Sequence, residues 1–158
     1  MSVGIKIASF TINHKTFAAV RLEPALYLAA TPIGNLGDIT IRVLEALAGA
    51  NLVACEDTRV TGKLLSHFAI KTPTTSYHEH NADIAGEKLL GKIALGEAIV
   101  LTSDAGTPLV SDPGFRLVVG ARERGIRVIP LPGASAPLAA LTASGLPNTR
   151  WSFSGFLP

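Results

Sequence analysis

The sequence Ala25-Leu26-Tyr27-Leu28-Ala29-Ala30-Thr31 is an apolar run of strand length, and it leads directly into the loop Pro32-Ile33-Gly34-Asn35-Leu36-Gly37-Asp38. A short apolar run bounded by Gly and Pro is typical of a buried strand. Residues 39–50 then show helical spacing of apolar side chains, and Asp38 is a suitable N-cap for that helix. Together these pieces predict a strand, a loop and a helix in succession, the repeating unit of an α/β fold.

The same unit recurs along the rest of the chain. Strand-length apolar runs alternate with helical segments, which implies parallel strands joined by right-handed crossovers. We therefore predict an α/β fold: an open, five-stranded, mostly parallel sheet flanked by helices. The predicted strands are residues 25–31, 51–55, 74–77, 98–102 and 127–130, the predicted helices are residues 39–50, 58–68, 83–95, 113–124 and 135–144, and another extended run starts at Trp151 and reaches Phe156.

Composition limits the class of protein. The chain has 158 residues, of which 47% are hydrophobic and 16% charged, and its mean hydropathy is +0.37. These values predict a globular domain with a real core and exclude a disordered chain. The uncharged stretch 128–149 is interrupted by proline and glycine, so we expect no membrane span. Cys55 is the only cysteine, which excludes an internal disulfide and a thiolate metal cage and favours a reducing cytoplasm.

Residues 1–24 are expected to be an extension before a domain of residues 25–158, with weak strand-like alternation at Val3, Ile5 and Ile7 and no signal peptide. The extension has a net charge of +2, whereas residues 25–158 carry 11 basic and 11 acidic side chains. The domain therefore lacks the overall basic bias of a nucleic-acid-binding protein. Its nearest basic cluster is interpreted as a solvated helix face: Arg116, Arg122, Arg124 and Arg127.

Three loops that follow predicted strands are rich in Gly, Pro and small polar residues: residues 31–38, 103–114 and 130–136. Any one of them alone would be interpreted as a turn or a helix cap. Ligands of open parallel sheets bind at the carboxyl ends of the strands, where all three loops should lie. The three together predict a binding crevice at that edge.

Common ligand motifs are absent from these loops. Gly34 and Gly37 do not complete a dinucleotide-binding G-x-G-x-x-G, and Gly62-Lys63 does not complete a phosphate-binding Walker loop. Ser135 lacks the second glycine of a hydrolase nucleophile elbow, and no histidine follows His80. The sequence therefore excludes a nucleoside triphosphate cradle and a serine hydrolase.

A metal site remains open as a minor alternative. His78 and His80 are two apart and could share one face of a strand, with carboxylates available from Glu56, Asp57, Asp104 or Asp112. Histidines in polar loops more often bond to neighbouring groups, and we expect no resident metal. Glu56 and Asp57 follow a strand and point to the same edge, although Asp57 or Thr58 could simply cap the next helix.

The loop sequences closely resemble those of the ribosomal RNA small subunit 2′-O-methyltransferase I family, a branch of the tetrapyrrole methylases. The similarity covers about residues 26–158 and leaves out residues 1–24. It is carried by LAATPIGNLGDIT at 28–40, EDTR at 56–59 with Thr61 and Gly62, HEHN at 78–81, SDAGTP at 103–108, SDPG at 111–114, PGASA at 132–136, SGLP at 144–147 and GFLP at 155–158.

The resemblance implies methylation of a cytidine ribose 2′-hydroxyl in small-subunit (16S) ribosomal RNA, with S-adenosyl-L-methionine as cofactor. It also implies two α/β domains with the cofactor between them, of which residues 25–158 are the N-terminal one, and a cytoplasmic homodimer acting on the RNA or the assembled small subunit. The residues that the resemblance assigns to the cofactor are Pro32, Ile33, Gly34, Asp104, Ala105, Gly106, Thr107, Val110, Ser135 and Ala136.

A ribose hydroxyl is a weak nucleophile, so a general base is expected near the acceptor. We favour the segment that contains Glu56, Asp57 and Arg59, with Arg59 on a phosphate and an acidic neighbour accepting the proton. Because residues 25–158 are neutral overall, most RNA affinity is expected to come from the second domain, a partner copy or the subunit. Two alternatives stay open: a methyltransferase of a tetrapyrrole or another small molecule, and a non-catalytic binding module.

Overall fold

The computed structural model describes residues 8–155, and its centre is a five-stranded sheet in the spatial order β5-β4-β6-β3-β7. The strands are β3 (Leu26–Ala29), β4 (Leu52–Cys55), β5 (Thr74–Ser76), β6 (Ile99–Thr102) and β7 (Val128–Leu131). All four pairings in this sheet are parallel. The predicted α/β class and five-stranded sheet are confirmed.

The burial of each strand agrees with its position in the sheet. All four residues of β6 are buried, as expected for a central strand covered on both faces. β5 and β7 are the edges, and their residues are mostly half-buried or exposed. Pro130 lies in β7 and has no amide hydrogen for a ladder, so an edge position suits it.

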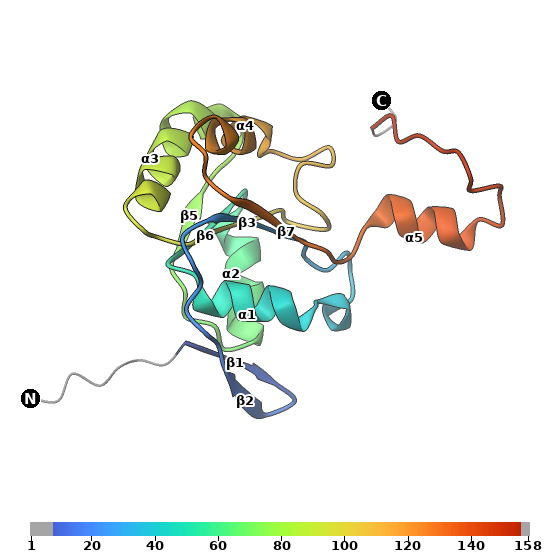
Figure 1. Cartoon of the computed structure of the whole chain (residues 1–158). Coiled ribbons are helices and arrows are strands. Elements are labelled where there is room, and N and C mark those ends of the chain that lie inside the picture. Colours follow the sequence, from blue (N-terminus) through green and yellow to red (C-terminus); the bar gives the residue numbers. More distant parts are fainter. Residues whose placement is uncertain (1–7, 156–158) are drawn as a thin grey trace, which may run out of the picture.

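The helices form a layer on each face of the sheet (Figure 1). One layer contains α1 (Ile41–Gly49) and α2 (Thr58–His67), and the other contains α3 (Ala82–Ala94) and α4 (Phe115–Glu123). Each layer has its own apolar core, with Leu44 and Leu47 in the first and Leu90 and Leu117 in the second. Since β4 and β6 are neighbours whose following helices cover opposite faces, their carboxyl ends form a crevice.

The helix caps differ in part from expectation. Asp38 was predicted to cap the first helix, but it ends a 3-10 turn, η1 (Leu36–Asp38), and Thr40 caps α1 by accepting from the amide of Val43 at 3.2 Å. The Asp38 prediction is therefore wrong by two residues, because Asn35 closes a turn of its own. The prediction that Asp57 or Thr58 caps the next helix is confirmed, since Asp57 is the N-cap of α2.

An antiparallel hairpin precedes the sheet and was not predicted. It pairs β1 (Ser9–Ile12) with β2 (Lys15–Ala18). Phe10 is buried in the core of the α1 layer, its ring lies 5.5 Å from that of Phe17, and the amide of Thr11 donates to Phe68 at 2.8 Å. Part of the expected extension therefore packs on the domain; Val3, Ile5 and Ile7 lie outside the described residues.

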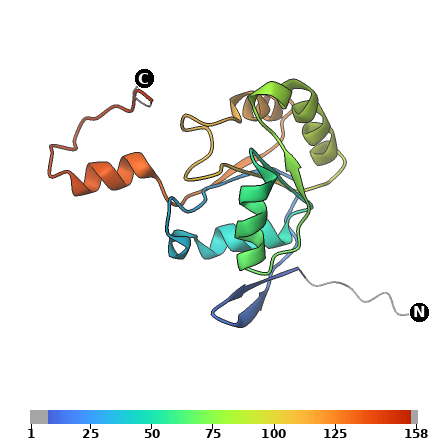
Figure 2. The same ribbon diagram turned by 180° about the vertical axis from the view of Figure 1, so that it is seen from behind.

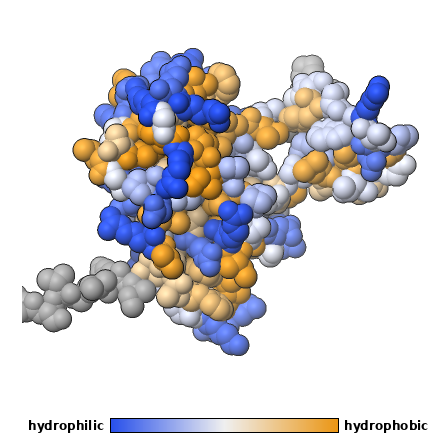
Figure 3. All heavy atoms as spheres, viewed as in Figure 1, coloured by the Kyte–Doolittle hydropathy of each residue, from blue (hydrophilic) through white to orange (hydrophobic). Residues whose placement is uncertain are grey.

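The segment after β7 projects from the body in both ribbon views (Figures 1 and 2). It contains α5 (Ala136–Ala143), which has no buried residue although nearly all of its residues are apolar or small. In the space-filling view this segment stands apart from the body, with a hollow between them (Figure 3). The extended run expected from Trp151 forms no strand up to residue 155, and Phe156 lies outside the described part. None of the helices in residues 8–155 is long and apolar enough to cross a membrane.

The predicted arginine face is solvated and largely neutralised. Arg116 pairs with Asp83 at 2.7 Å, and Arg124 pairs with Glu87 at 2.8 Å, so α4 and its C-cap are tied to α3, the helix that follows a 3-10 turn, η2 (Glu79–Asn81). Arg127 lies 3.5 Å from Glu23. Exposed pairs of this kind contribute little stability, but they remove the face as a free basic surface.

Gly49, the last residue of α1, contacts the chain that follows the β1-β2 hairpin, residues 19–22, here called the hairpin segment. A side chain at Gly49 is therefore predicted to lower stability. A Cβ at Gly49 would collide with the backbone carbonyl of Val20, and Leu22 donates to the Gly49 carbonyl at 3.3 Å. We expect Gly49→Ala to lower the free energy of unfolding by about 1–3 kcal/mol in urea titrations.

Gly91→Ala is the matched control, because Gly91 is exposed within α3 and a Cβ there meets nothing within 4 Å. It should leave stability unchanged or raise it by up to about 1 kcal/mol. Equal effects of the two substitutions would contradict the packing of the hairpin segment on α1.

Candidate active site

Two of the predicted loops are joined at the carboxyl edge of the sheet. The Thr31 amide donates to the Gly106 carbonyl at 2.8 Å, and the Gly106 amide donates to the Thr31 carbonyl at 3.0 Å. The side chains reinforce this pairing, because the Thr31 hydroxyl donates to the Ser103 carbonyl at 3.1 Å and the Ser103 hydroxyl donates to the Gly106 carbonyl at 2.9 Å. Both hydroxyls are buried, so the loops after β3 and β6 behave as one unit.

Gly106 is required at this junction for two reasons. Its φ of +83° is a conformation that residues with side chains rarely adopt. A Cβ would also lie 3.3 Å from Cγ2 of Ile33. The third loop joins the same unit, since the Thr107 hydroxyl donates to the Ala134 carbonyl at 3.2 Å.

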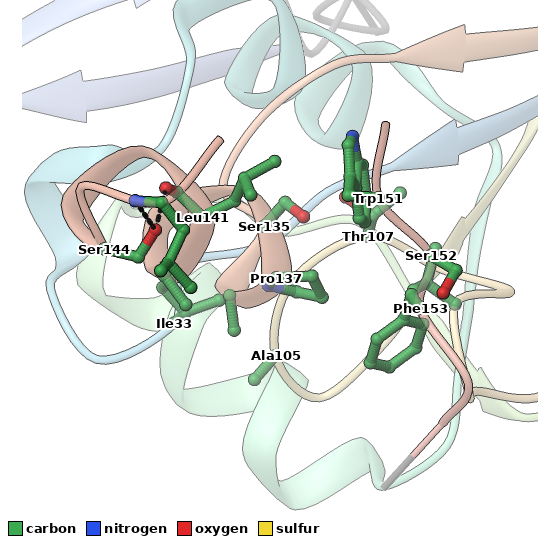
Figure 4. A pocket seen from close by; sticks show the side chains of 15 residues that line it. Ile33, Ala105, Thr107, Ser135, Pro137, Leu141, Ser144, Trp151, Ser152 and Phe153 are labelled. Carbon is green, nitrogen blue, oxygen red and sulfur yellow. Dashed lines mark hydrogen bonds between the residues drawn. The ribbon is translucent and has the colours of Figure 1, made fainter. Parts of the chain in front are cut away.

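A cavity of about 560 Å³ lies between these loops and α5, and we call it the α5 cavity (Figure 4). Its size is in the usual range for small-molecule sites. Seven residues predicted to contact a cofactor line it: Ile33, Ala105, Gly106, Thr107, Val110, Ser135 and Ala136. The far wall comes from α5 and from Trp151 to Phe153, which were predicted only as a helix and an extended run. The apolar side chains that follow the third loop were the signal that could have indicated this wall.

The other three predicted cofactor residues, Pro32, Gly34 and Asp104, face a second cavity of about 430 Å³. It lies against α2, and we call it the α2 cavity. In the loop after β3, Ile33 lines the α5 cavity between two residues, Pro32 and Gly34, that line the α2 cavity. In the loop after β6 the lining changes from the α2 cavity to the α5 cavity between Asp104 and Ala105. The joined loops are therefore a partition with one cavity on each side, and the structure separates the predicted set into two groups.

Glu56, Asp57 and Arg59, the predicted catalytic residues, share a third, open cavity with His78, His80 and Asp104, here named the Glu56 cavity. Asp57 is already engaged there: its carboxylate accepts from the Arg59 amide at 2.8 Å and from the Arg59 guanidinium at 2.7 Å. The Arg59 hydrogen bonds lower the pKa of Asp57 to about 2. A carboxylate so stabilised is a poor proton acceptor, whereas Glu56 is exposed and has no such partner among the described residues.

Asp104 connects the cavities, because it lines both the α2 cavity and the Glu56 cavity and accepts from the Asp57 amide at 3.2 Å. Asp112 lies nearby and is half-buried. Burial first, and then the negative charges of Glu56 and Asp104, raise the pKa of Asp112 to about 6. Three carboxylates thus repel one another at this edge of the sheet.

The residues considered for a metal are not arranged as a metal site. The rings of His78 and His80 lie 6.0 Å apart at 63° to each other. Within residues 8–155 no three His, Cys, Asp or Glu side chains are placed to hold an ion. Nδ1 of His78 is buried and has no hydrogen-bond partner in the described part of the chain.

Comparison with known proteins agrees with this architecture. The family model described as Tetrapyrrole (Corrin/Porphyrin) Methylases matches residues 25–157. The chain belongs to this family. As a tetrapyrrole methylase domain it also resembles the solved uroporphyrin-III-C-methyltransferase of Thermus thermophilus, with a TM-score of 0.59 and 24% identity over 79% of this chain and 53% of that one. That likeness concerns the fold.

Curated relatives are much more similar in sequence. The protein of Mesorhizobium japonicum named Ribosomal RNA small subunit methyltransferase I is 65% identical over 147 residues, which are 93% of this chain and 50% of that protein. A Vibrio cholerae protein of the same name is 55% identical over 135 residues, 85% of this chain and 47% of its own length. The chain thus spans about half the length of these relatives. An alignment of 147 residues must also extend into residues 1–24, so the expectation that the similarity leaves them out is wrong for the Mesorhizobium relative.

The raised pKa of Asp112 predicts that its ionised carboxylate lowers the stability of the fold at high pH. The folded-state pKa of about 6 lies above the ordinary 3.8, so the stability gained from the protonated form is complete below about pH 4 and is lost as the pH rises through 6. We expect Asp112→Asn to raise the free energy of unfolding by about 1 kcal/mol at pH 8, a value reduced for solvent screening, and by less at pH 4. Urea unfolding at both pH values checks this; an equal effect at the two would contradict it.

Proposed function

We propose that the protein to which this chain corresponds uses S-adenosyl-L-methionine to methylate the ribose 2′-hydroxyl of a cytidine in small-subunit (16S) ribosomal RNA. The observation that carries the proposal is the α5 cavity, in which seven residues from three separate loops line one space. The names of the two curated relatives described above support the RNA substrate.

The residues present fit the proposed cofactor. The α5 cavity is mainly apolar, with backbone groups of tight loops at one wall, and the absence of a Cβ at Gly106 keeps that wall close to Ile33. An adenine ring and a thioether chain suit such a lining. When bound, the cofactor supplies a methyl group on a positively charged sulfur. The chain's own contribution is to hold the loops so that this group and the acceptor are aligned.

The partition suggests a division of roles. Ile33, Ala105 and Gly106 serve the cofactor from one side, whereas Pro32, Gly34 and Asp104 serve the boundary with the acceptor on the other. Glu56 is our proposed proton acceptor, because Asp57 is bound to Arg59 and caps α2. Arg59, whose side chain is 86% exposed, is proposed to contact an RNA phosphate.

Further proposals concern the rest of the protein. We propose that residues 25–158 form an N-terminal methylase domain, that a second domain completes the cleft over the exposed α5, and that the protein is a cytoplasmic homodimer acting on ribosomal RNA or the assembled small subunit. The half-length match to the relatives and the unburied α5 support the second domain.

Methyl transfer tests the proposal. This chain would be joined to the C-terminal half of the Mesorhizobium japonicum relative, and the chimera incubated with methyl-labelled cofactor and either small-subunit RNA, assembled small subunits or uroporphyrinogen. Label on a cytidine 2′-oxygen is expected. Label on the tetrapyrrole alone, with the Mesorhizobium enzyme active on RNA in parallel, would overturn the RNA assignment.

The cofactor side predicts an effect of Gly106→Ala. The substitution forces a side chain into a positive-φ position and against Ile33, so we expect at least a tenfold loss of S-adenosylhomocysteine affinity in calorimetry of the chimera. Gly125→Ala is the control, since Gly125 also has a positive φ (+66°) but a Cβ there meets nothing within 4 Å. Equal affinities in the two variants would argue against the α5 cavity as the cofactor site.

The acceptor side predicts a contrast between two neighbouring acids. Glu56→Gln should lower kcat by about 10²–10⁴, the usual contribution of a general base. Asp57→Asn should lower it less than about tenfold, because asparagine also caps a helix. Single-turnover methyl transfer by the chimera at saturating RNA measures the rate of each variant. A larger loss of rate in Asp57→Asn than in Glu56→Gln would assign the role of proton acceptor to Asp57.

A further inference from the structure

One face of α2 is turned towards the loop after β3. Val60, Lys63, Leu64 and His67 are spaced by three, one and three residues, which places them on one side of a helix, and all four line the α2 cavity. The core-facing side of α2 carries the buried Leu65. The α2 cavity is therefore built by a helix face and not by a chance gap between loops.

The opposite wall is the loop with Pro32, Gly34 and Leu36, and the floor is the buried pair Thr31 and Ser103. A Cβ at Gly34 would meet nothing within 4 Å, so the loop leaves open space above the floor. Both walls of the α2 cavity carry apolar side chains: Pro32, Leu36, Val60 and Leu64. A narrow cavity between two apolar walls, here called a slot, suits a flat base ring or one face of a sugar.

Charge is distributed unevenly around this slot. Lys63 and His67 lie one helical turn apart on the α2 wall, and the carboxylate in the cavity, Asp104, belongs to the loop after β6. Lys63 is exposed and makes no ion pair or hydrogen bond within residues 8–155, unlike Arg116, Arg124 and Lys92, which pair with acids. An exposed ammonium left unpaired beside an apolar slot suits an anion, and a lysine binds phosphate as a point charge.

We propose that the α2 cavity binds a nucleotide of the RNA acceptor, with its base or sugar between the loop and α2 and its phosphate at Lys63 and His67. The inference rests on the proposed function and adds a substrate subsite to it. The position agrees with this role, because Asp104 connects the α2 cavity to Glu56 and the joined loops separate it from the α5 cavity. Because residues 25–158 are neutral overall, phosphate binding by this domain depends on local contacts of this kind and not on its net charge.

Titration of the isotope-labelled 158-residue chain with cytidine 3′,5′-bisphosphate, followed by amide NMR, tests the subsite. We expect shifts at Gly34, Leu36, Val60 and Lys63, and about tenfold weaker binding in Lys63→Gln. Unphosphorylated cytidine should bind the variant and the unchanged chain equally. Lys88→Gln is the matched control, because Lys88 is an exposed lysine of α3 on the other face of the sheet.

Several outcomes would overturn the subsite: no shifts up to about 10 mM ligand, shifts confined to other residues, or equal affinity in Lys63→Gln and the unchanged chain. Methyl transfer by the chimera separates this result from the proposed function. If the chimera methylates RNA but the 158-residue chain does not bind the bisphosphate, the subsite alone is overturned. A chimera that methylates only the tetrapyrrole overturns the function, whatever the titration gives.

Discussion

Two backbone hydrogen bonds between Thr31 and Gly106 hold the functional edge of this domain together. They join loops that are more than 70 residues apart in sequence, and they form only because Gly106 adopts a positive φ and carries no side chain towards Ile33. The buried hydroxyls of Thr31 and Ser103 complete the junction. With the loops fixed in this way, Ile33 and Ala105 face one side and Pro32, Gly34 and Asp104 the other, and the edge of the sheet becomes a wall between two cavities.

This wall explains how a nearly neutral, charge-poor domain can carry separate sites. The α5 cavity is mainly apolar and is bounded on one side by α5, a helix with no buried residue. The α2 cavity and the Glu56 cavity contain the ionisable groups and share Asp104. The ion pairs between α3 and the α4 segment neutralise charge on the opposite face of the sheet, whereas Lys63 lies unpaired at the α2 cavity.

The acidic residues of the edge illustrate how position divides roles among similar groups. Asp57 is stabilised as a carboxylate by Arg59 and by the start of α2, which lowers its pKa to about 2. Asp112 is half-buried beside two other acids, which raises its pKa to about 6. Sequence spacing placed these residues at one edge, but it could not tell them apart, because burial and hydrogen bonding are properties of the folded chain.

The sequence by itself determined the α/β class, the order of strands and helices from residue 25, and the three loops at the functional edge, since apolar periodicity and Gly-Pro loops are local signals. It also determined the family through these same loops. Only the tertiary structure decided the packing of the β1-β2 hairpin on α1, the cap at Thr40 in place of Asp38, and the separation of Ile33 from Pro32 and Gly34 into different cavities. Each of these depends on contacts between residues distant in sequence or on competition between neighbouring polar groups, which local patterns do not contain.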